Sequence, residues 1–229
     1  MKLASLFSGG KDSTFAIYLA QKQGHDVVCL LSVIPKSDES HLLHYPNMQW
    51  TKLQSESMNI PQLTVTLDSD NTDEELSSLE ELLQKAKEQF GIEGLVHGGI
   101  KSNFQKDKFE ILCHKLNLVA VAPLWDTEPN SYMNHLLDSK FNFIMTTVTA
   151  DGLDDSWLGK LISKSDIDIL KNLSEKFGFN LNFEGGESET FVINCPLFTN
   201  PININQSKKI WDGYRGRFEI VDARLNYNA

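Results

Sequence analysis

Short apolar, β-branched runs alternate with longer amphipathic stretches through the first half of this chain. The runs have the length of strands and the stretches have the length of helices, which is the pattern of parallel strands joined by crossover helices. We therefore predict a parallel sheet of five strands, at residues 2–7, 26–33, 62–67, 94–97 and 118–122.

Two of the intervening stretches show a clear helical repeat of apolar positions. In residues 72–90 the apolar side chains recur at helical spacing, and charged side chains occupy the other face. The stripe consists of Leu76, Leu79, Leu83, Ala86 and Phe90. A second stripe consists of Phe109, Leu112, Cys113 and Leu116. Both stripes predict a buried helix face rather than a binding surface.

The composition of the sequence changes after Trp125, where a polar segment that contains a proline follows the apolar runs. We place a domain boundary there, which gives a first domain at residues 1–126 and a smaller α+β domain at residues 127–229. The second domain is expected to contain a strand at residues 143–148.

Two further elements are predicted in the second domain. The segment that begins at Ser165 resembles a capping box and predicts the start of a helix that ends near Phe177. The alternating residues 217–225 predict an edge strand.

Composition indicates an ordinary globular chain of 229 residues, with 41% hydrophobic and 23% charged residues. No apolar run reaches membrane-spanning length, and the N-terminus does not resemble a signal peptide. The three cysteines are far apart in the sequence and form no paired motif, so we expect a reduced, cytoplasmic protein without a thiolate metal site. The oligomeric state stays open, and a homo-oligomer is compatible with the sequence.

The formal net charge of −10 argues against nucleic acid as the main partner. Proteins that bind nucleic acid draw most of their affinity from Lys and Arg side chains that neutralise phosphates. Acidity alone also keeps a protein soluble, and a local basic patch stays compatible with the total.

The most informative motif comes between the first predicted strand and the first predicted helix, as Ser8, Gly9, Gly10, Lys11, Asp12 and Ser13. Paired glycines let a backbone turn sharply and approach an oxyanion, while the N–H groups and dipole of the next helix point toward it. The lysine adds a mobile positive charge, and the serines add hydroxyl donors. The motif lacks the spacing of a Walker-A loop. We predict a phosphate-binding loop; the alternative is a glycine-rich surface turn.

Ligands of open parallel sheets bind at the carboxyl ends of the strands. The second predicted strand ends near Leu31 and Val33, whose backbone groups could bind an adenine edge. The fourth ends at His97, Gly98 and Gly99, where paired glycines leave room for a ligand or a neighbouring backbone. His97 alone is more typical of a half-buried histidine than of a catalytic base.

Other polar segments are less specific. His41 and His44 have no further ligand at zinc spacing, so no zinc site is predicted. Trp157, flanked by acids and glycines, is either a packing anchor or one wall of a cation pocket. An acidic run suits a divalent or organic cation, or is an exposed turn. It consists of Glu184, Gly185, Gly186, Glu187, Ser188, Glu189 and Thr190.

Together these motifs resemble the diphthine–ammonia ligases, or diphthamide synthetases, of the adenine nucleotide α-hydrolase superfamily. The loop at residues 8–13 alone would indicate only the superfamily, whereas its combination with the acidic Gly-Gly run is specific to this family. The other matching positions are His44, Pro46, Asn47, Gly98, Ile100, Ser102, Gln105, residues 122–125 and residues 152–159.

The sequence departs from the family pattern at a few positions. Lysine replaces the usual arginine at three positions, Lys106, Lys108 and Lys160. The positive charge is kept, but lysine cannot form the bidentate hydrogen bonds of arginine. Phe183 and Ser188 replace a usual glycine and a usual aromatic residue. The length resembles the short archaeal form, and bacterial relatives that act on another carboxylate stay possible.

The resemblance implies a Rossmann-like, HUP-type fold and an ATP-dependent amidation. ATP, with Mg²⁺, activates the carboxylate of diphthine on translation elongation factor 2 as an acyl adenylate, and ammonia then displaces AMP. It also implies roles for the residues above. The catalytic residues are Lys11, Asp12 and Glu187, with Asp12 as the metal ligand. The nucleotide-binding residues are Ser8, Gly9, Gly10, Lys11, Asp12, Ser13, Leu31, Val33, Gly98 and Gly99. The substrate-binding residues are His44, Asn47, Ser102, Gln105, Trp157, Glu184, Gly185, Gly186, Glu187, Glu189 and Thr190.

Two other functions use the same loop. A tRNA-modifying enzyme of the superfamily is expected to be basic, and one that thiolates usually has paired cysteines; this chain shows neither. The second alternative is a module that binds ATP without turnover, and only the release of pyrophosphate would distinguish the ligase from it.

Overall fold

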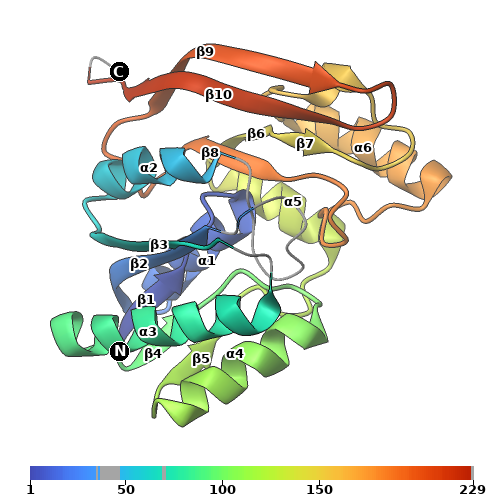
Figure 1. Ribbon diagram of the computed structural model, residues 1–229. Coiled ribbons are helices and arrows are strands. Elements are labelled where there is room, and N and C mark those ends of the chain that lie inside the picture. Colours follow the sequence, from blue (N-terminus) through green and yellow to red (C-terminus); the bar gives the residue numbers. More distant parts are fainter. Residues whose placement is uncertain (35, 37–46, 69–70, 228–229) are drawn as a thin grey trace.

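The computed structural model describes residues 1–34, 36, 47–68 and 71–227. They form a five-stranded parallel sheet flanked by helices, together with two smaller antiparallel sheets from the C-terminal part of the chain (Figure 1). The predicted α/β class and the smaller α+β part are therefore confirmed. The parallel strands are β1 (Lys2–Leu6), β2 (Asp26–Ile34), β3 (Gln62–Thr66), β4 (Gly94–Val96) and β5 (Val119–Val121).

The strand order is β3-β2-β1-β4-β5, so β1 lies at the centre of the sheet. The chain moves outward from β1 through β2 to β3 and then returns to the other side of β1 as β4. This reversal is a topological switch point, where a crevice opens beyond the carboxyl ends of neighbouring strands. The ends of β1 and β4 lie side by side at this crevice.

Alternate strand residues face opposite sides of the sheet and bury two separate apolar layers. Leu3, Leu30 and Val96 share a core with the first helix, whereas Ala4 and Leu31 share a core with two helices on the other face. Those two helices are seen below the sheet in Figure 1. The three helices are α1 (Lys11–Lys22), α3 (Thr72–Phe90) and α4 (Asn103–Lys115).

The remaining elements belong mostly to the C-terminal part. Strand β6 pairs with β8, and strand β10 lies between β7 and β9. The helical elements are η1 (Met48–Trp50), α2 (Thr51–Met58), α5 (Pro129–Asp138), η2 (Asp155–Trp157) and α6 (Lys164–Phe177). The strands are β6 (Asn142–Met145), β7 (Thr147–Val148), β8 (Thr190–Asn194), β9 (Ile202–Trp211) and β10 (Gly216–Leu225).

The single strand predicted at residues 143–148 is in fact two strands in different sheets. Thr146 separates β6 from β7, and its backbone bonds to the residue before β8 and to a residue of β10. Its N–H donates to the Glu189 carbonyl at 2.8 Å, and its carbonyl accepts from the Phe218 N–H at 2.7 Å. A continuous apolar run does not reveal such a switch, because both halves have strand character.

Two predictions for the C-terminal part were wrong in detail. The tail strand β10 is central in its sheet rather than at an edge, since β9 covers its other side. Helix α6 begins two residues earlier than predicted, because Ser163 and Asp166 form the capping box. The hydroxyl of Ser163 accepts from the Asp166 N–H, and the Asp166 carboxylate accepts from the Ser163 N–H at 2.9 Å.

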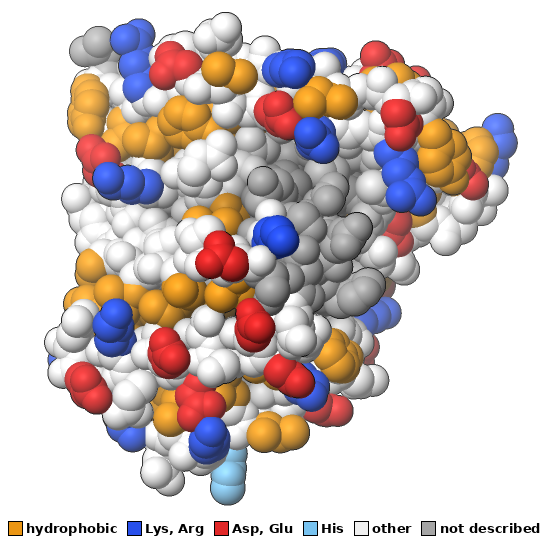
Figure 2. Space-filling view, in the orientation of Figure 1, with side chains coloured by type: hydrophobic (Ala, Val, Ile, Leu, Met, Phe, Trp, Pro, Cys, Tyr) orange, Lys and Arg blue, Asp and Glu red, His pale blue; other side chains and the backbone are white. Residues whose placement is uncertain are grey.

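The core beside α1 continues into the C-terminal part of the chain. It includes Phe15 of α1 together with Tyr132, Phe143, Phe191 and Phe218. The division between residues 126 and 127 stays a prediction. No helix within the described residues is long and apolar enough to cross a membrane. On the face shown in Figure 2, Lys and Arg side chains lie scattered among Asp and Glu.

Candidate active site

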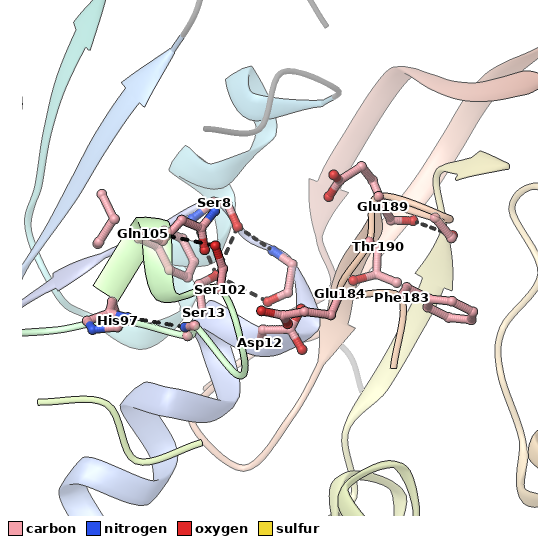
Figure 3. Close-up of a pocket in the computed structure, with 18 of the residues that line it drawn as sticks. Ser8, Asp12, Ser13, His97, Ser102, Gln105, Phe183, Glu184, Glu189 and Thr190 are labelled. Atoms are coloured by element: carbon pink, nitrogen blue, oxygen red, sulfur yellow. Dashed lines mark hydrogen bonds between the residues drawn. The ribbon is translucent and has the colours of Figure 1, made fainter. Parts of the chain in front are cut away.

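A cavity of about 370 Å³ lies beyond the carboxyl ends of β1 and β4. It is lined by the loop after β1, the segment between β4 and α4, and the acidic segment before β8. In Figure 3, Glu184 and Glu189 lie on one side, and Ser8, Ser102 and Gln105 lie on the other. The sequence-predicted site residues that line it are Ser8, Gly10, Asp12, Ser13, Val33, Gly98, Gly99, Ser102, Gln105, Glu184, Gly185, Gly186, Glu189 and Thr190.

The loop before α1 presents hydroxyl and amide groups to this cavity. The hydroxyls of Ser8 and Ser13 are 3.1 Å apart, and the Gly10 N–H donates to the Ser8 hydroxyl at 3.5 Å. Gly10, the N-cap residue of α1, has no side chain that could cap the helix. The positive end of the helix therefore faces the loop, which suits an anionic group.

Two glycines make the close packing of this loop possible. Gly9 has a φ of +77°, and a Cβ there would lie 2.3 Å from Oε1 of Gln54. A Cβ on Gly98 would lie 2.7 Å from the backbone nitrogen of Ser13. Gly98 therefore permits the close approach of the β4 end to α1, which is the neighbouring-backbone alternative, and it also lines the cavity.

The loop is also hydrogen-bonded to β8, which lies far away in the sequence. The Val192 N–H donates to the Gly9 carbonyl at 3.0 Å, and the Lys11 N–H donates to the Thr190 hydroxyl at 3.0 Å. Gln54 of α2 is fully buried and donates to the carbonyls of Gly9 at 2.9 Å and Val192 at 2.8 Å. These bonds fix the acidic segment beside the loop. Nothing in the local sequence of Gln54 predicted this role.

Lys11 differs from its expected role as a mobile charge. Its side chain is buried, at 2% exposure, and does not line the cavity. Its Nζ donates to both carboxylate oxygens of Asp12 at 2.9 Å and to the Asn182 carbonyl at 2.7 Å. The ammonium also lies over the rings of Tyr132 and Phe183. The lysine thus connects the loop to the C-terminal part of the chain.

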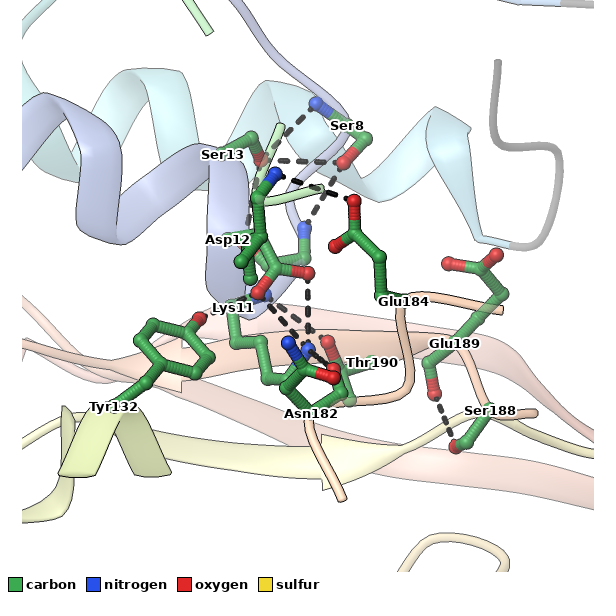
Figure 4. A network of polar contacts seen from close by, with 12 residues as sticks. Ser8, Lys11, Asp12, Ser13, Tyr132, Asn182, Glu184, Ser188, Glu189 and Thr190 are labelled. Carbon is green, nitrogen blue, oxygen red and sulfur yellow. Dashed lines mark hydrogen bonds and ion pairs between the residues drawn. The ribbon is translucent and has the colours of Figure 1, made fainter. Parts of the chain in front are cut away.

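Asp12 has a second partner that the sequence did not indicate. The Tyr132 hydroxyl, from α5, donates to Oδ1 of Asp12 (Figure 4). Burial, followed by the adjacent Asp12 charge and this hydrogen bond, raises the pKa of Tyr132 well above its usual value. Tyr132 therefore keeps its proton and remains a donor to the carboxylate.

The acidic segment contributes two carboxylates to the cavity. Oε1 of Glu184 accepts from the backbone N–H groups of Ile100 at 3.2 Å and Lys101 at 3.0 Å, which joins this segment to the β4 end. Glu189 lines the cavity, and its N–H donates to the Thr147 hydroxyl at 2.6 Å. The segment lies against the loop, so it is not the remote exposed turn of the alternative interpretation.

Glu187, the third acid of the run, does not line the cavity. Its Oε1 accepts from the N–H and the side-chain amide of Asn180, each at 2.8 Å, and its Oε2 accepts from the Gly185 N–H at 2.7 Å. The carboxylate therefore stabilises the turn around Gly185. This placement corrects the expectation that Glu187 acts on the substrate directly, since both of its carboxylate oxygens already accept hydrogen bonds from Asn180 or Gly185.

Apolar side chains line part of the cavity. They are Leu6, Phe7, Val33, Met48 and Phe109. Leu31, whose backbone was expected to bind an adenine edge, is fully buried and does not line the cavity, and its carbonyl accepts from the Phe7 N–H at 2.8 Å. His97 lines the cavity, packs edge-on against Phe109, and accepts from the Gly99 N–H through Nδ1 at 3.2 Å. Burial and the nearby Lys106 charge lower the pKa of His97 to about 4, so the ring is neutral.

Two predicted substrate residues lie elsewhere. The side chain of Asn47 donates to the Phe218 carbonyl and accepts from the Ile220 N–H, both at 2.9 Å, and thereby connects η1 to β10. Trp157 is buried outside the cavity, with the Lys160 ammonium 4.5 Å from its ring centre. These contacts contradict a direct substrate role for either side chain. His44 lies outside the described residues.

The cavity suits a nucleotide in its chemistry. An apolar slot for a base adjoins a helix N-terminus and hydroxyl donors that suit phosphates. No group of three His, Cys, Asp or Glu side chains among the described residues could hold a metal by itself. One carboxylate at the loop, Asp12, nevertheless fits Mg²⁺, which commonly takes one or two carboxylates and completes its shell with phosphates and water.

Comparison with protein families gives two matches. The diphthamide synthase N-terminal domain matches residues 1–121, and the diphthamide synthase C-terminal domain matches residues 128–225.

Individual proteins are similar over most of their length. The diphthine–ammonia ligases of Bos taurus and Homo sapiens are each 32% identical over 228 residues, which covers 92% of this chain and 85% of theirs. Among solved structures, a predicted subunit of tRNA methyltransferase from Methanocaldococcus jannaschii is 17% identical, with a TM-score of 0.42, over 86% of this chain and 98% of its own.

Proposed function

Because this chain belongs to the diphthamide synthase family, we propose that it is an ATP-dependent diphthine–ammonia ligase. The enzyme would form an amide from a carboxylate and ammonia, with release of AMP and pyrophosphate. Translation elongation factor 2 carrying diphthine is the proposed protein substrate. A cytoplasmic location stays a prediction.

The observation that carries this proposal is that one cavity is lined by both the predicted phosphate-binding loop, at residues 8–13, and the acidic segment. Hydrogen bonds from Val192 to Gly9 and from Lys11 to Thr190 join the two parts directly. A ligase that activates a carboxylate must bring the nucleotide and the carboxylate together, because effective concentration supplies much of the rate enhancement. This shared cavity meets that requirement.

The nucleotide phosphates would lie at the N-terminus of α1, beside the hydroxyls of Ser8 and Ser13. Asp12 would hold Mg²⁺, which neutralises the charge that develops on pyrophosphate. The apolar slot beside Val33 would take the base. When bound, ATP supplies the AMP leaving group that makes a carboxylate an effective acyl donor. His97, neutral at physiological pH, adds no charge to the slot.

Glu184 and Glu189 would receive the trimethylammonium group of diphthine. Trp157, which the sequence offered as one wall of a cation pocket or as a packing anchor, lies outside the cavity. Phe183 lines the cavity, yet its ring already faces the Lys11 ammonium at 5.5 Å and Phe179 at 6.4 Å. We therefore propose recognition by carboxylates, which balance a fixed positive charge without a cation–π contact.

A tRNA-modifying activity is the less favoured alternative. The net charge is −10, and Figure 2 shows no gathered basic patch on the face it presents. We expect filter binding at physiological salt to detect no useful affinity for bulk tRNA, since phosphate neutralisation carries such binding. Tight, salt-sensitive retention of tRNA would favour the alternative.

The nucleotide product tests the proposed chemistry. The protein is incubated with ATP, ammonium and diphthine-bearing elongation factor 2, and the nucleotides are separated by chromatography. AMP and pyrophosphate in equal amounts are expected. ADP as the product would contradict the proposal, and a stable complex with ATP that releases no pyrophosphate would favour a non-catalytic binding module.

A further inference from the structure

Tyr132 contacts the nucleotide loop from the C-terminal part of the chain. It belongs to α5, its side chain is 1% exposed, and its ring packs at 6.0 Å against Phe15 of α1. Its hydroxyl donates to Oδ1 of Asp12. The hydroxyl is thus a buried polar group whose partner is a carboxylate at the cavity.

The contacts of Asp12 distinguish its two oxygens. Each carboxylate oxygen offers about two acceptor sites. Oδ1 accepts from Tyr132 and from the Lys11 Nζ, whereas Oδ2 accepts from the same Nζ alone. Among the described contacts, the acceptor site that remains therefore belongs to Oδ2. Figure 4 shows the Asp12 carboxylate between Tyr132 on one side and Glu184 on the other.

Lys11 cannot produce this asymmetry by itself. Its Nζ lies 2.9 Å from both oxygens of Asp12, so it stabilises the carboxylate without selecting a rotation. The Tyr132 hydroxyl touches one oxygen and does select it. The Asp12 side chain is 32% exposed, which leaves part of it accessible from the cavity that it lines.

We propose that Tyr132 is a positioning residue that fixes Oδ1 of Asp12 and thereby presents Oδ2 to the Mg²⁺ of a bound nucleotide. This inference rests on the proposed function. Outer partners that orient a carboxylate ligand commonly change metal affinity by about tenfold or more when they are removed. Tyr132 fits this role because it is rigidly buried, and its hydroxyl meets the carboxylate from the side away from Glu184.

The test compares ATP binding with and without Mg²⁺ by calorimetry. Tyr132→Phe keeps the ring and removes the hydroxyl. We expect the gain in ATP affinity that Mg²⁺ produces to fall about tenfold, while the affinity in EDTA stays unchanged. Tyr18→Phe is the matched control, because Tyr18 stacks on the same Phe15 at 5.7 Å and its full Mg²⁺ gain should persist.

A cycle with Asp12→Asn separates positioning from simple packing. Once the carboxylate is absent, Tyr132→Phe should change the Mg²⁺ gain no further. The inference would be overturned if Tyr132→Phe kept the full gain in ATP affinity from Mg²⁺. It would also be overturned if Tyr132→Phe reduced that gain equally with Asp12 present and with Asp12→Asn. If the unmodified protein binds ATP with no gain from Mg²⁺, the metal role in the proposed function fails first, and this inference fails with it.

Discussion

Gly9 carries the strictest steric requirement of the loop. We expect Gly9→Ala to destabilise the fold by about 3 kcal/mol, because strain at positive φ adds to a clash with buried Gln54. Gly24→Ala is the matched control: its φ is +85°, but a Cβ there meets nothing within 4 Å, so only about 1 kcal/mol should be lost. Urea unfolding measures both. Equal losses would show that the contact with Gln54 is unimportant.

His97 predicts a pH dependence of stability. Its pKa is about 4 in the folded chain against 6.5 for an ordinary histidine, so the unfolded chain binds more protons between these values. Stability is therefore lost as pH falls through 6.5 toward 4, by roughly 2 kcal/mol from this group at pH 5. When the free energy of unfolding is measured with urea at pH 7 and pH 5, His97→Asn should lose less stability between the two pH values than the unmodified protein. The same change in both proteins would contradict the assignment.

The acidic run should divide into two kinds of residue. Glu189→Gln should lower the amidation rate by about tenfold or more with ATP affinity little changed, because Glu189 lines the cavity. Glu187→Gln should lower stability, since its oxygens bond Asn180 and Gly185. Initial rates and urea unfolding, measured on both variants, separate the two effects. A larger loss of stability in Glu189→Gln than in Glu187→Gln would reverse these two roles.

At the scale of elements, Asn47 connects η1 and α2 to the C-terminal sheet. Its side chain makes two buried hydrogen bonds with β10. We expect Asn47→Ala to cost about 2 kcal/mol and to speed hydrogen exchange at the Ile220 amide. Asn205→Ala is the control, because it removes an exposed hydrogen bond from β9 to Asp222 of β10. It should cost less than about 0.5 kcal/mol. Unchanged exchange at Ile220 in Asn47→Ala would contradict this connection.

The sequence predicts the parallel sheet well, because each of its strands is a local apolar run between longer amphipathic stretches. It predicts the loop at residues 8–13 for the same reason, since the motif is local. It could not predict that residues 143–148 divide at Thr146 or that β10 is central. Those features depend on which strands pair, and the partner of β6, which is β8, and the second partner of β10, which is β7, are distant in the sequence.

The candidate site shows the same limit. The sequence identifies polar residues near the cavity, but it cannot tell a side chain that faces the cavity from one that turns into its own segment, as Glu187 does. Gln54 and Tyr132 were missed because neither belongs to a recognisable motif. Their partners, Gly9 and Asp12, are distant in the chain. Only the folded structure shows which way a side chain points and which residues that are distant in the sequence it contacts.

At the scale of the whole molecule, the two parts of the chain act through one shared core and one shared cavity. The parallel sheet supplies the loop, and the C-terminal part supplies Tyr132, Glu184 and Glu189. Hydrogen bonds between the loop and β8 keep these groups together. We therefore expect the nucleotide and the second substrate to meet between the two parts.

The most direct test is mass spectrometry of the protein substrate itself. Diphthine-bearing elongation factor 2 is incubated with this protein, ATP and ammonium, and the peptide that carries diphthine is analysed. We predict that the diphthine carboxylate becomes an amide, and only when ATP and ammonium are both present. A peptide that keeps its carboxylate under these conditions, while the protein remains folded and binds ATP, would contradict the central claim.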